Sequence, residues 1–193
     1  MTLTEGVWVF LETERMVLRR LTRADGENLV GLDSDPAVMR FLGNGQPTPR
    51  VVIERGTLPR MLGCYERFGG LGYWAAESKS RGQFLGWFEL RPHSGYPMDE
   101  VELGYRLRSQ VWGRGYATEG ARAVLERGFR DYGVRRVFAT TMAVNLPSRR
   151  VLEKCGMRWV RTFHQDSPDP IAGAEHGDVE YELLWRDWYS RRS

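Results

Sequence analysis

Cysteine is scarce in this chain, and the two residues that occur lie far apart. Cys64 and Cys155 are the only cysteines among 193 residues. A disulfide framework needs several cysteines, and a zinc site needs closely spaced Cys or His pairs. The sequence therefore predicts neither a disulfide scaffold nor a metal site, and we expect a reducing, cytoplasmic location.

Long apolar runs are also missing. The apolar run at residues 7–11 is about five residues long, against the roughly 20 that a membrane-spanning helix needs. It also lacks the basic flank of a signal peptide. We therefore expect a soluble protein with no membrane partner, and this run is a candidate contact surface for a homodimer.

The chain has no large excess of charge of one sign. Lys and Arg number 28 against 25 Asp and Glu, which leaves a formal net charge of +3. Nucleic-acid-binding domains normally concentrate a larger basic excess on one face. We expect no nucleic-acid partner, although Arg149-Arg150 and Arg191-Arg192 keep such a role open as a third hypothesis.

Repeats, low-complexity tracts and linkers are absent too, and the chain is 41% hydrophobic, enough to bury a substantial core. We therefore expect a single domain over residues 1–193. Apolar periodicity and turn residues predict its elements. Strands are expected at residues 15–21, 72–77, 83–90, 100–107, 136–142, 159–164 and 179–184, and helices at 22–34, 36–42, 48–68 with an interruption near Pro59, 117–132 and 147–154.

The order of these elements places a hairpin first and a strand-helix-strand unit later. Such a unit implies a parallel, right-handed crossover, so we expect a mixed α/β (α+β) fold. The strand at 100–107 alternates clearly, with Val101 and Leu103 on a core face and Glu102 on the opposite face. That second face is available for chemistry.

A glycine-containing loop lies between this strand and the long helix that follows. In Gln110-Val-Trp-Gly113-Arg-Gly115-Tyr-Ala-Thr118, two glycines precede the first helical turn, whose backbone N–H groups have no intrahelical partners. Without a Cβ at Gly113 and Gly115, a diphosphate can approach these groups, and the helix dipole favours its negative charge. The loop is therefore a candidate phosphate-binding site.

Two common nucleotide-binding patterns do not fit this loop. The P-loop needs Gly-Lys-Ser/Thr after four residues, which is absent. The dinucleotide fingerprint needs a third glycine where Thr118 stands and an acid near the end of the next strand, where Ala139-Thr140-Thr141 has none. Both patterns are excluded.

The loop and a later segment together resemble the acetyl-CoA motifs of the GNAT N-acetyltransferase superfamily. Gln110-x-x-Gly113-x-Gly115 is similar to its acetyl-CoA loop. The segment from Asn145 to Met157, NLPSRRVLEKCGM, is similar to the N-x-x-S-x-x-(V/L)-(L/Y)-E-K-x-G-(F/M) pattern of its RimJ/RimL-like branch. Residues 11–19, LETERMVLR, are also typical of that branch, so the resemblance spans nearly the whole chain.

The resemblance implies a fold, a cofactor and its contacts. The fold is a mostly antiparallel sheet of six to seven strands with helices on both faces, splayed at its one parallel crossover, and the cofactor is acetyl-CoA. Asn145 is implied to bind the pantetheine arm; the alternative reading of the residue alone is a helix cap. The implied pyrophosphate-binding residues are Gln110, Gly113, Arg114, Gly115, Ala117 and Thr118, and Leu107 and Arg108 are implied to pair with the pantetheine amides.

Acetyl transfer to an amine also needs a base and a route for the thiolate to leave. Glu102 is the candidate base, since it faces away from the core and the family often uses a glutamate on this strand. Many members place a tyrosine acid where this chain has Leu152. The resemblance therefore shifts the acid role to Ser148, which is implied to lie near the thioester sulfur, and leaves open that no dedicated acid exists.

The acceptor side is expected to involve residues 25–68 and the polar loop 165–177, whose acidic residues could attract a cationic amine. The leading hypothesis is an N-acetyltransferase that acts on an α-amine of a protein or on a small-molecule amine. The alternative is a catalytically weak acetyl-CoA-binding domain that serves as a sensor or interaction module.

Overall fold

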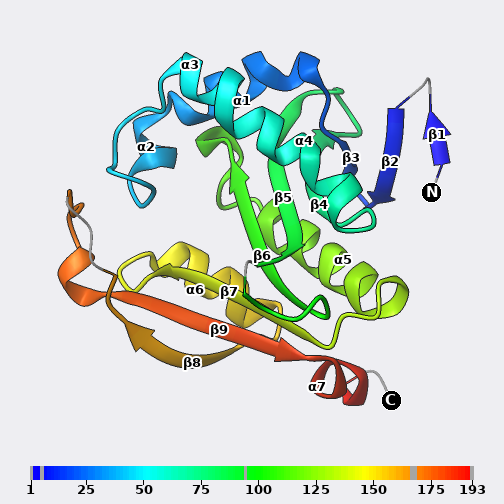
Figure 1. Ribbon diagram of the computed structural model, residues 1–193, viewed down its shortest axis with the longest axis vertical. Helices are drawn as coiled ribbons and strands as arrows, with labels where there is room; N and C mark the ends of the chain where they lie inside the picture. The colour runs from blue at the N-terminus through cyan, green and yellow to red at the C-terminus, as the bar shows by residue number, and fades with distance from the viewer. Residues whose placement is uncertain (1, 5–6, 94, 166–168, 192–193) are drawn as a thin grey trace.

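The computed structural model describes residues 2–4, 7–93, 95–165 and 169–191, so Arg192 lies outside the described residues. They form one sheet of nine strands in the order β1-β2-β3-β4-β5-β6-β7-β9-β8 (Figure 1). The strands are β1 (Thr2–Thr4), β2 (Val7–Glu12), β3 (Met16–Arg20), β4 (Gly72–Ser78), β5 (Phe84–Pro92), β6 (Glu100–Leu107), β7 (Arg136–Met142), β8 (Arg158–Phe163) and β9 (Asp178–Leu184).

The mixed, mostly antiparallel class is confirmed, and the sheet is larger than the six to seven strands expected. The two additional strands, β1 and β2, come from the N-terminal segment. Val9 and Phe10 are buried, and the Phe10 ring stacks on Trp74 at 3.7 Å between centroids. The apolar run that we considered as a dimer contact is therefore largely used inside this chain.

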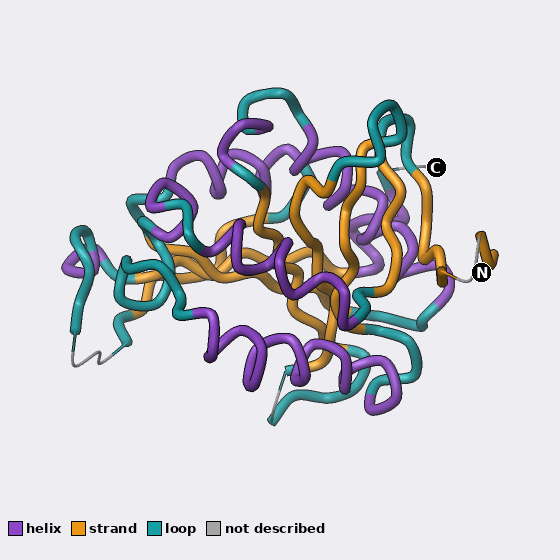
Figure 2. Tube along the Cα trace, turned by 90° about the horizontal axis from the view of Figure 1, so that it is seen from above, coloured by secondary structure: helices purple, strands orange, loops and turns teal. Residues whose placement is uncertain are grey.

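Helices cover both faces of the sheet, as the view from above shows (Figure 2). They are α1 (Gly26–Asp33), α2 (Pro36–Met39), α3 (Arg50–Val52), α4 (Leu58–Arg67), α5 (Tyr116–Asp131), α6 (Leu146–Lys154) and α7 (Trp185–Ser190), with short 3₁₀ turns at Arg23–Asp25, Ser109–Val111 and Ala174–His176. Within the described part of the chain, no helix is both long and apolar enough to cross a membrane.

Two hydrophobic cores result from the strand alternation. Odd-numbered residues of β6, such as Val101 and Leu103, pack with α5 in the larger core. Neighbouring β5 sends Phe88 to the same side and Trp87 to the other, where α1 and α4 cover it. The sheet therefore separates an α5 side from an α1/α4 side.

The helical region predicted at residues 48–68 is irregular just before its proline. A π-helical turn, Ile53–Thr57, joins α3 to α4. Pro59 lies in the first turn of α4, where its missing N–H is tolerated. The irregularity thus precedes Pro59, and Ile53 is fully buried beneath it.

The long helix α5 starts and ends at glycines, as predicted. Gly115 precedes it with φ 83° and Gly133 follows it with φ 65°, both in the left-handed region that favours glycine. At Gly120 the helix lies so close to the sheet that an added Cβ would be 2.2 Å from the Phe88 ring. This close contact fixes where the start of the helix meets the sheet.

The sheet opens at its single parallel pair. Among the described residues β6 and β7 are the only parallel neighbours, and they pair only at Glu100–Arg136, Val101–Val137 and Glu102–Phe138. Beyond Glu102 the two strands separate, so that β5 and β6 run in a clearly different direction from β7, β8 and β9 (Figure 1). We call the space between β6 and β7 beyond Glu102 the wedge.

Candidate functional site

The glycine loop leads from the open end of β6 to the first turn of α5. Gly113 has φ 72°, and an added Cβ there would meet nothing within 4 Å. Gln110, Gly113, Arg114 and Gly115 are exposed, whereas Ala117 and Thr118 are half-buried in the first helical turn. Open space, free helix N–H groups and a positive dipole end suit a diphosphate, so these residues fit the pyrophosphate of acetyl-CoA.

Arg15, near the N-terminal end of the chain, contacts this loop and the helix that follows it. Its Nη1 donates to the Arg114 carbonyl at 2.9 Å, and its Nε donates to the Glu119 carboxylate at 2.6 Å. The guanidinium also lies 4.2 Å from the centre of the Tyr116 ring. Sequence reasoning missed this role, because Arg15 belongs to a family-typical segment but no spacing links it to residues about a hundred positions away.

Leu107 and Arg108 differ in what their peptide groups can reach. The Arg108 N–H donates to Leu85 on β5 at 2.8 Å, and its carbonyl accepts from Val111 at 3.1 Å. Successive residues of a strand direct their peptide groups to opposite sides, so those of Leu107 face the wedge. There the Leu107 carbonyl accepts a hydrogen bond from the Trp112 indole at 2.8 Å. Only Leu107 of this pair therefore has backbone groups directed into the wedge.

Asn145 and Ser148 begin α6 at the far side of the wedge. The Asn145 side chain accepts from the Ser148 N–H at 3.3 Å, which makes it the helix cap. Its amide also donates to Thr141 Oγ1 at 3.2 Å. The capping reading is thus correct, and one amide N–H is already used within the protein.

Tyr105 of β6, which the sequence analysis did not single out, reaches Ser148. Tyr105 Oη lies 3.1 Å from Ser148 Oγ and 3.1 Å from the Ser148 carbonyl oxygen. Leu152, at the position where many relatives have a tyrosine, is buried and apolar. The alternation of β6 places Tyr105 on the same face as Val101 and Leu103, but nothing local in the sequence indicated that Ser148 is its partner.

Glu102 lies where the β6–β7 pairing ends, on the face opposite Val101 and Leu103. Its carboxylate is 3.3 Å from Arg91 Nη2 and 3.5 Å from Thr140 Oγ1. Burial raises the pKa of Glu102 above its ordinary value, and the nearby Glu89 carboxylate adds to this, while Arg91 opposes it. A carboxylate with a raised pKa is a better proton acceptor, as a general base requires.

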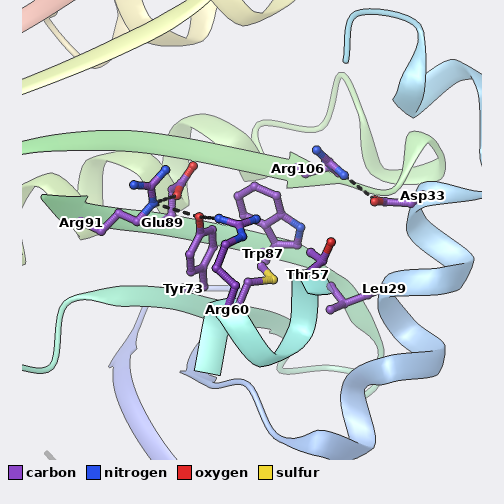
Figure 3. A pocket seen from close by; sticks show the side chains of 10 residues that line it. Leu29, Asp33, Thr57, Arg60, Tyr73, Trp87, Glu89, Arg91 and Arg106 are labelled. Carbon is purple, nitrogen blue, oxygen red and sulfur yellow. Dashed lines mark hydrogen bonds and ion pairs between the residues drawn. The ribbon is translucent and has the colours of Figure 1, made fainter. Parts of the chain in front are cut away.

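A cavity of about 210 Å³ opens on the α1/α4 side of the sheet. Figure 3 shows polar groups at both ends and Trp87 between them. Glu89 is paired with Arg91 at 2.7 Å, and Asp33 is paired with Arg106 at 2.6 Å. Its walls comprise Leu29, Asp33, Thr57, Arg60, Met61, Tyr73, Trp87, Glu89, Arg91 and Arg106.

Arg91 connects this cavity to Glu102, because it contacts Glu89 and Glu102 together. The cavity walls come partly from residues 25–68, the region in which the sequence analysis placed the acceptor side. The polar loop contributes elsewhere, since Asp169 to Ala172 and residues 36–46 border a second, more open hollow. Asp166, part of the same acidic loop, lies outside the described residues.

The geometry defines a class of enzyme. A mixed sheet that opens at one parallel pair, beside a glycine loop at a helix N-terminus, suits an enzyme that binds a diphosphate-bearing cofactor. A comparison with models of known protein families identifies this class of enzyme. The model of the acetyltransferase (GNAT) domain matches residues 15–158, and this chain belongs to that family.

Individual similar proteins are also named as acetyltransferases. The chain is 33% identical to the FsC-acetyl coenzyme A-N(2)-transacetylase of Aspergillus fumigatus, over 92% of this chain and 77% of the relative. Its fold is similar to that of RimL, an α-N-protein acetyltransferase in complex with coenzyme A, with TM-score 0.76, 15% identity and coverage of 91% and 97%. It is also similar to spermidine N-acetyltransferase from Vibrio cholerae, with TM-score 0.73, 16% identity and coverage of 90% and 98%.

The chain is therefore an acetyl-CoA-dependent N-acetyltransferase, and acetyl-CoA is its cofactor. The resemblance seen in the sequence to the RimJ/RimL-like branch is consistent with the fold of RimL.

Proposed function

We propose that this enzyme transfers the acetyl group directly to a primary amine while acetyl-CoA and the amine are bound together. The observation that supports this most is the division of roles between the two faces of β6. Glu102 belongs to the cavity side, whereas Tyr105 and Ser148 belong to the α5/α6 side. An amine arriving from the cavity and a thiolate leaving toward α6 are thus served from opposite sides.

Bound acetyl-CoA supplies a thioester. The chain's own residues have three tasks around it. Glu102 takes the proton that the amine must lose, since a lysine-type amine titrates near 10.4 and is otherwise protonated. The Leu107 N–H, directed into the wedge, donates to the carbonyl oxygen as negative charge develops there. Ser148 donates a hydrogen bond to the leaving sulfur, and a thiol of pKa near 8.5 needs no more than that.

We further propose that the acceptor amine enters the cavity between α4 and the sheet. At about 210 Å³ it accommodates a small amine or the first residue of a peptide, and it favours neither class by size alone. Paired charges at its ends can orient a polar acceptor, and Trp87 can contact the apolar part of it. The relative from Aspergillus fumigatus is named for an N(2) transfer, which supports including small-molecule amines.

A screen for free-thiol release from acetyl-CoA tests this function. Polyamines, amino acids and their amides, and peptides with different N-terminal residues form the panel. We expect release that requires an amine and that falls strongly in Glu102→Gln. A wild-type enzyme that binds acetyl-CoA but releases no thiol with any amine would instead support the sensor alternative.

A further inference from the structure

Tyr105 connects two elements that meet across the wedge. It lies near the open end of β6, and its hydroxyl reaches both the hydroxyl and the carbonyl of Ser148 in the first turn of α6. The two residues are 43 positions apart in the sequence. The contact therefore depends on the fold, and it lies on the side of β6 opposite Glu102.

The hydrogen-bond chemistry of this trio allows two arrangements. A carbonyl oxygen can only accept, whereas each hydroxyl has one proton to donate. When Tyr105 donates to the carbonyl, the Ser148 hydroxyl donates to Tyr105. When Tyr105 donates to Ser148 Oγ instead, the Ser148 proton is free to point elsewhere. The second arrangement is the one in which Ser148 can donate to a sulfur atom in the wedge.

Tyr105 stays a donor over the working range of pH. Burial raises its pKa well above the ordinary value for tyrosine, although the hydrogen bond with Ser148 opposes this. A phenol held neutral cannot give up its proton to a thiolate of lower pKa, but it can donate a hydrogen bond. The role that the chemistry allows is orientation.

We infer that Tyr105 is a positioning residue that orients the Ser148 hydroxyl toward the leaving sulfur of coenzyme A. The inference rests on the proposed function. After Glu102 has taken the ammonium proton, the neutral amine nitrogen bonds to the acetyl carbon as the C–S bond breaks. The nitrogen then loses its second proton to water, and the thiolate takes a proton from water. No proton leaves Tyr105 or Ser148; they stabilise the negative sulfur through one hydrogen bond. Tyr105 thus brings a tyrosine hydroxyl from β6 to a site where Leu152 of α6 offers none.

The thiol of bound coenzyme A tests this without any acceptor. We expect its acid dissociation constant, followed by the ultraviolet absorbance of the thiolate in a pH titration, to be roughly tenfold lower in Tyr105→Phe than in wild type, because one hydrogen bond to a charged group is lost. Ser148→Ala should lower it equally, and the double variant should lower it no further. An unchanged constant in Tyr105→Phe, or independent effects that multiply in the double variant, would overturn the inference.

Turnover provides the second measurement. In Tyr105→Phe we expect kcat to fall roughly tenfold with the KM for acetyl-CoA within about twofold, since the lost hydrogen bond acts only as sulfur becomes negative. Tyr65→Phe is the matched control: it removes another buried hydroxyl, one that accepts from Leu21 N–H at 2.9 Å and donates to the Tyr73 carbonyl. It should lower the thermal midpoint while keeping kcat.

The outcomes distinguish an error in the role of Tyr105 from an error in the proposed function. If Tyr65→Phe and Tyr105→Phe lower kcat and thermal midpoint in parallel, Tyr105 is only structural and the inference is wrong. If the thiol titration responds as expected while no amine is acetylated, the inference stands and the proposed acceptor chemistry is wrong.

Discussion

Arg15 and Glu119 join the start of β3 to the first turn of α5. The main-chain N–H of Arg15 donates to Glu119 Oε1 at 3.0 Å, and its Nε donates to Oε2 at 2.6 Å. The pKa of Glu119 lies below its ordinary value although burial alone would raise it, because Thr13 and Arg15 donate hydrogen bonds to the carboxylate. The charged pair thus holds the helix end that follows the glycine loop.

Glu119→Ala should therefore weaken acetyl-CoA binding. A charge-assisted pair that is only partly exposed contributes on the order of 1 kcal/mol, so the Kd should rise about fivefold. Isothermal calorimetry measures this. Arg130→Ala is the control, because it removes an ion pair with Glu126 at 3.0 Å near the other end of the same helix and should leave the Kd unchanged. Equal effects of both variants would mean that Arg15 does not hold the loop.

Gly113→Ala should abolish the stabilisation by acetyl-CoA. A left-handed alanine costs roughly 1–2 kcal/mol, and its methyl group would occupy the space where a diphosphate approaches. Gly133→Ala is a matched control, since Gly133 has φ 65° and also meets nothing within 4 Å. Both variants should lose similar stability without ligand. Only Gly133→Ala should still gain in thermal midpoint when acetyl-CoA is added, and a full gain in Gly113→Ala would contradict the loop assignment.

Glu102→Gln should lower kcat about a hundredfold or more, as expected when a general base is removed. In the wild type, activity should fall as pH drops through the raised pKa of Glu102, that is, above the value of about 4.3 for free glutamate. A pH profile of kcat measures this fall in activity at low pH. If Glu102→Gln shows the same fall, a different group titrates there.

The same variant should be more stable than wild type at neutral pH. Because the folded-state pKa of Glu102 is raised, the protonated form favours the folded state below the unfolded pKa, and that contribution is lost as pH rises through the folded pKa. The thermal midpoint of Glu102→Gln should therefore exceed that of wild type at pH 8 and approach it at acid pH. A lower midpoint at pH 8 would show that the contacts with Arg91 and Thr140 outweigh burial.

Gly104→Ala tests the arrangement of Glu89 beside the cavity. An added Cβ would lie 2.3 Å from Glu89 Oε1 and 2.8 Å from its Cγ, so the buried carboxylate would have to leave Arg91. We expect a loss of about 1–3 kcal/mol in the free energy of unfolding and weaker activity. Gly63→Ala, on the exposed side of α4 with nothing within 4 Å, should instead gain up to about 1 kcal/mol. Urea unfolding measures whether the free energy of unfolding falls in Gly104→Ala and rises in Gly63→Ala.

The parts of the fold with a local signal were predictable from the sequence. Strand β6 shows alternation over its whole length, and α5 has an apolar stripe between Gly115 and Gly133, so both were located within a residue. Strand β2 was missed because its run of apolar residues shows no period, and only the pairing with β3 and the stack of Phe10 on Trp74 explain it.

The residues of the candidate site also differ in whether the sequence could predict them. Gly113 and Glu102 stand out because of the local loop pattern and the strand alternation, whereas Ser148 was indicated by the family resemblance of residues 145–157. Arg15 and Tyr105 act on residues about 100 and 43 positions away, and a single sequence carries no signal for such distant pairs. The Arg108 backbone was assigned to the cofactor by resemblance, but the strand register directs it to β5.

The wedge has a mechanical meaning as well. Backbone pairing between the two halves of the sheet is confined to three positions, and beyond them the halves are joined through side chains of the larger core. A ligand that fills the wedge would contact both β6 and α6 and would hold the two halves of the sheet together. The enzyme should then unfold in broad, overlapping steps when alone and in one sharp step when acetyl-CoA is bound, which makes its cofactor part of its cooperativity as well as its chemistry.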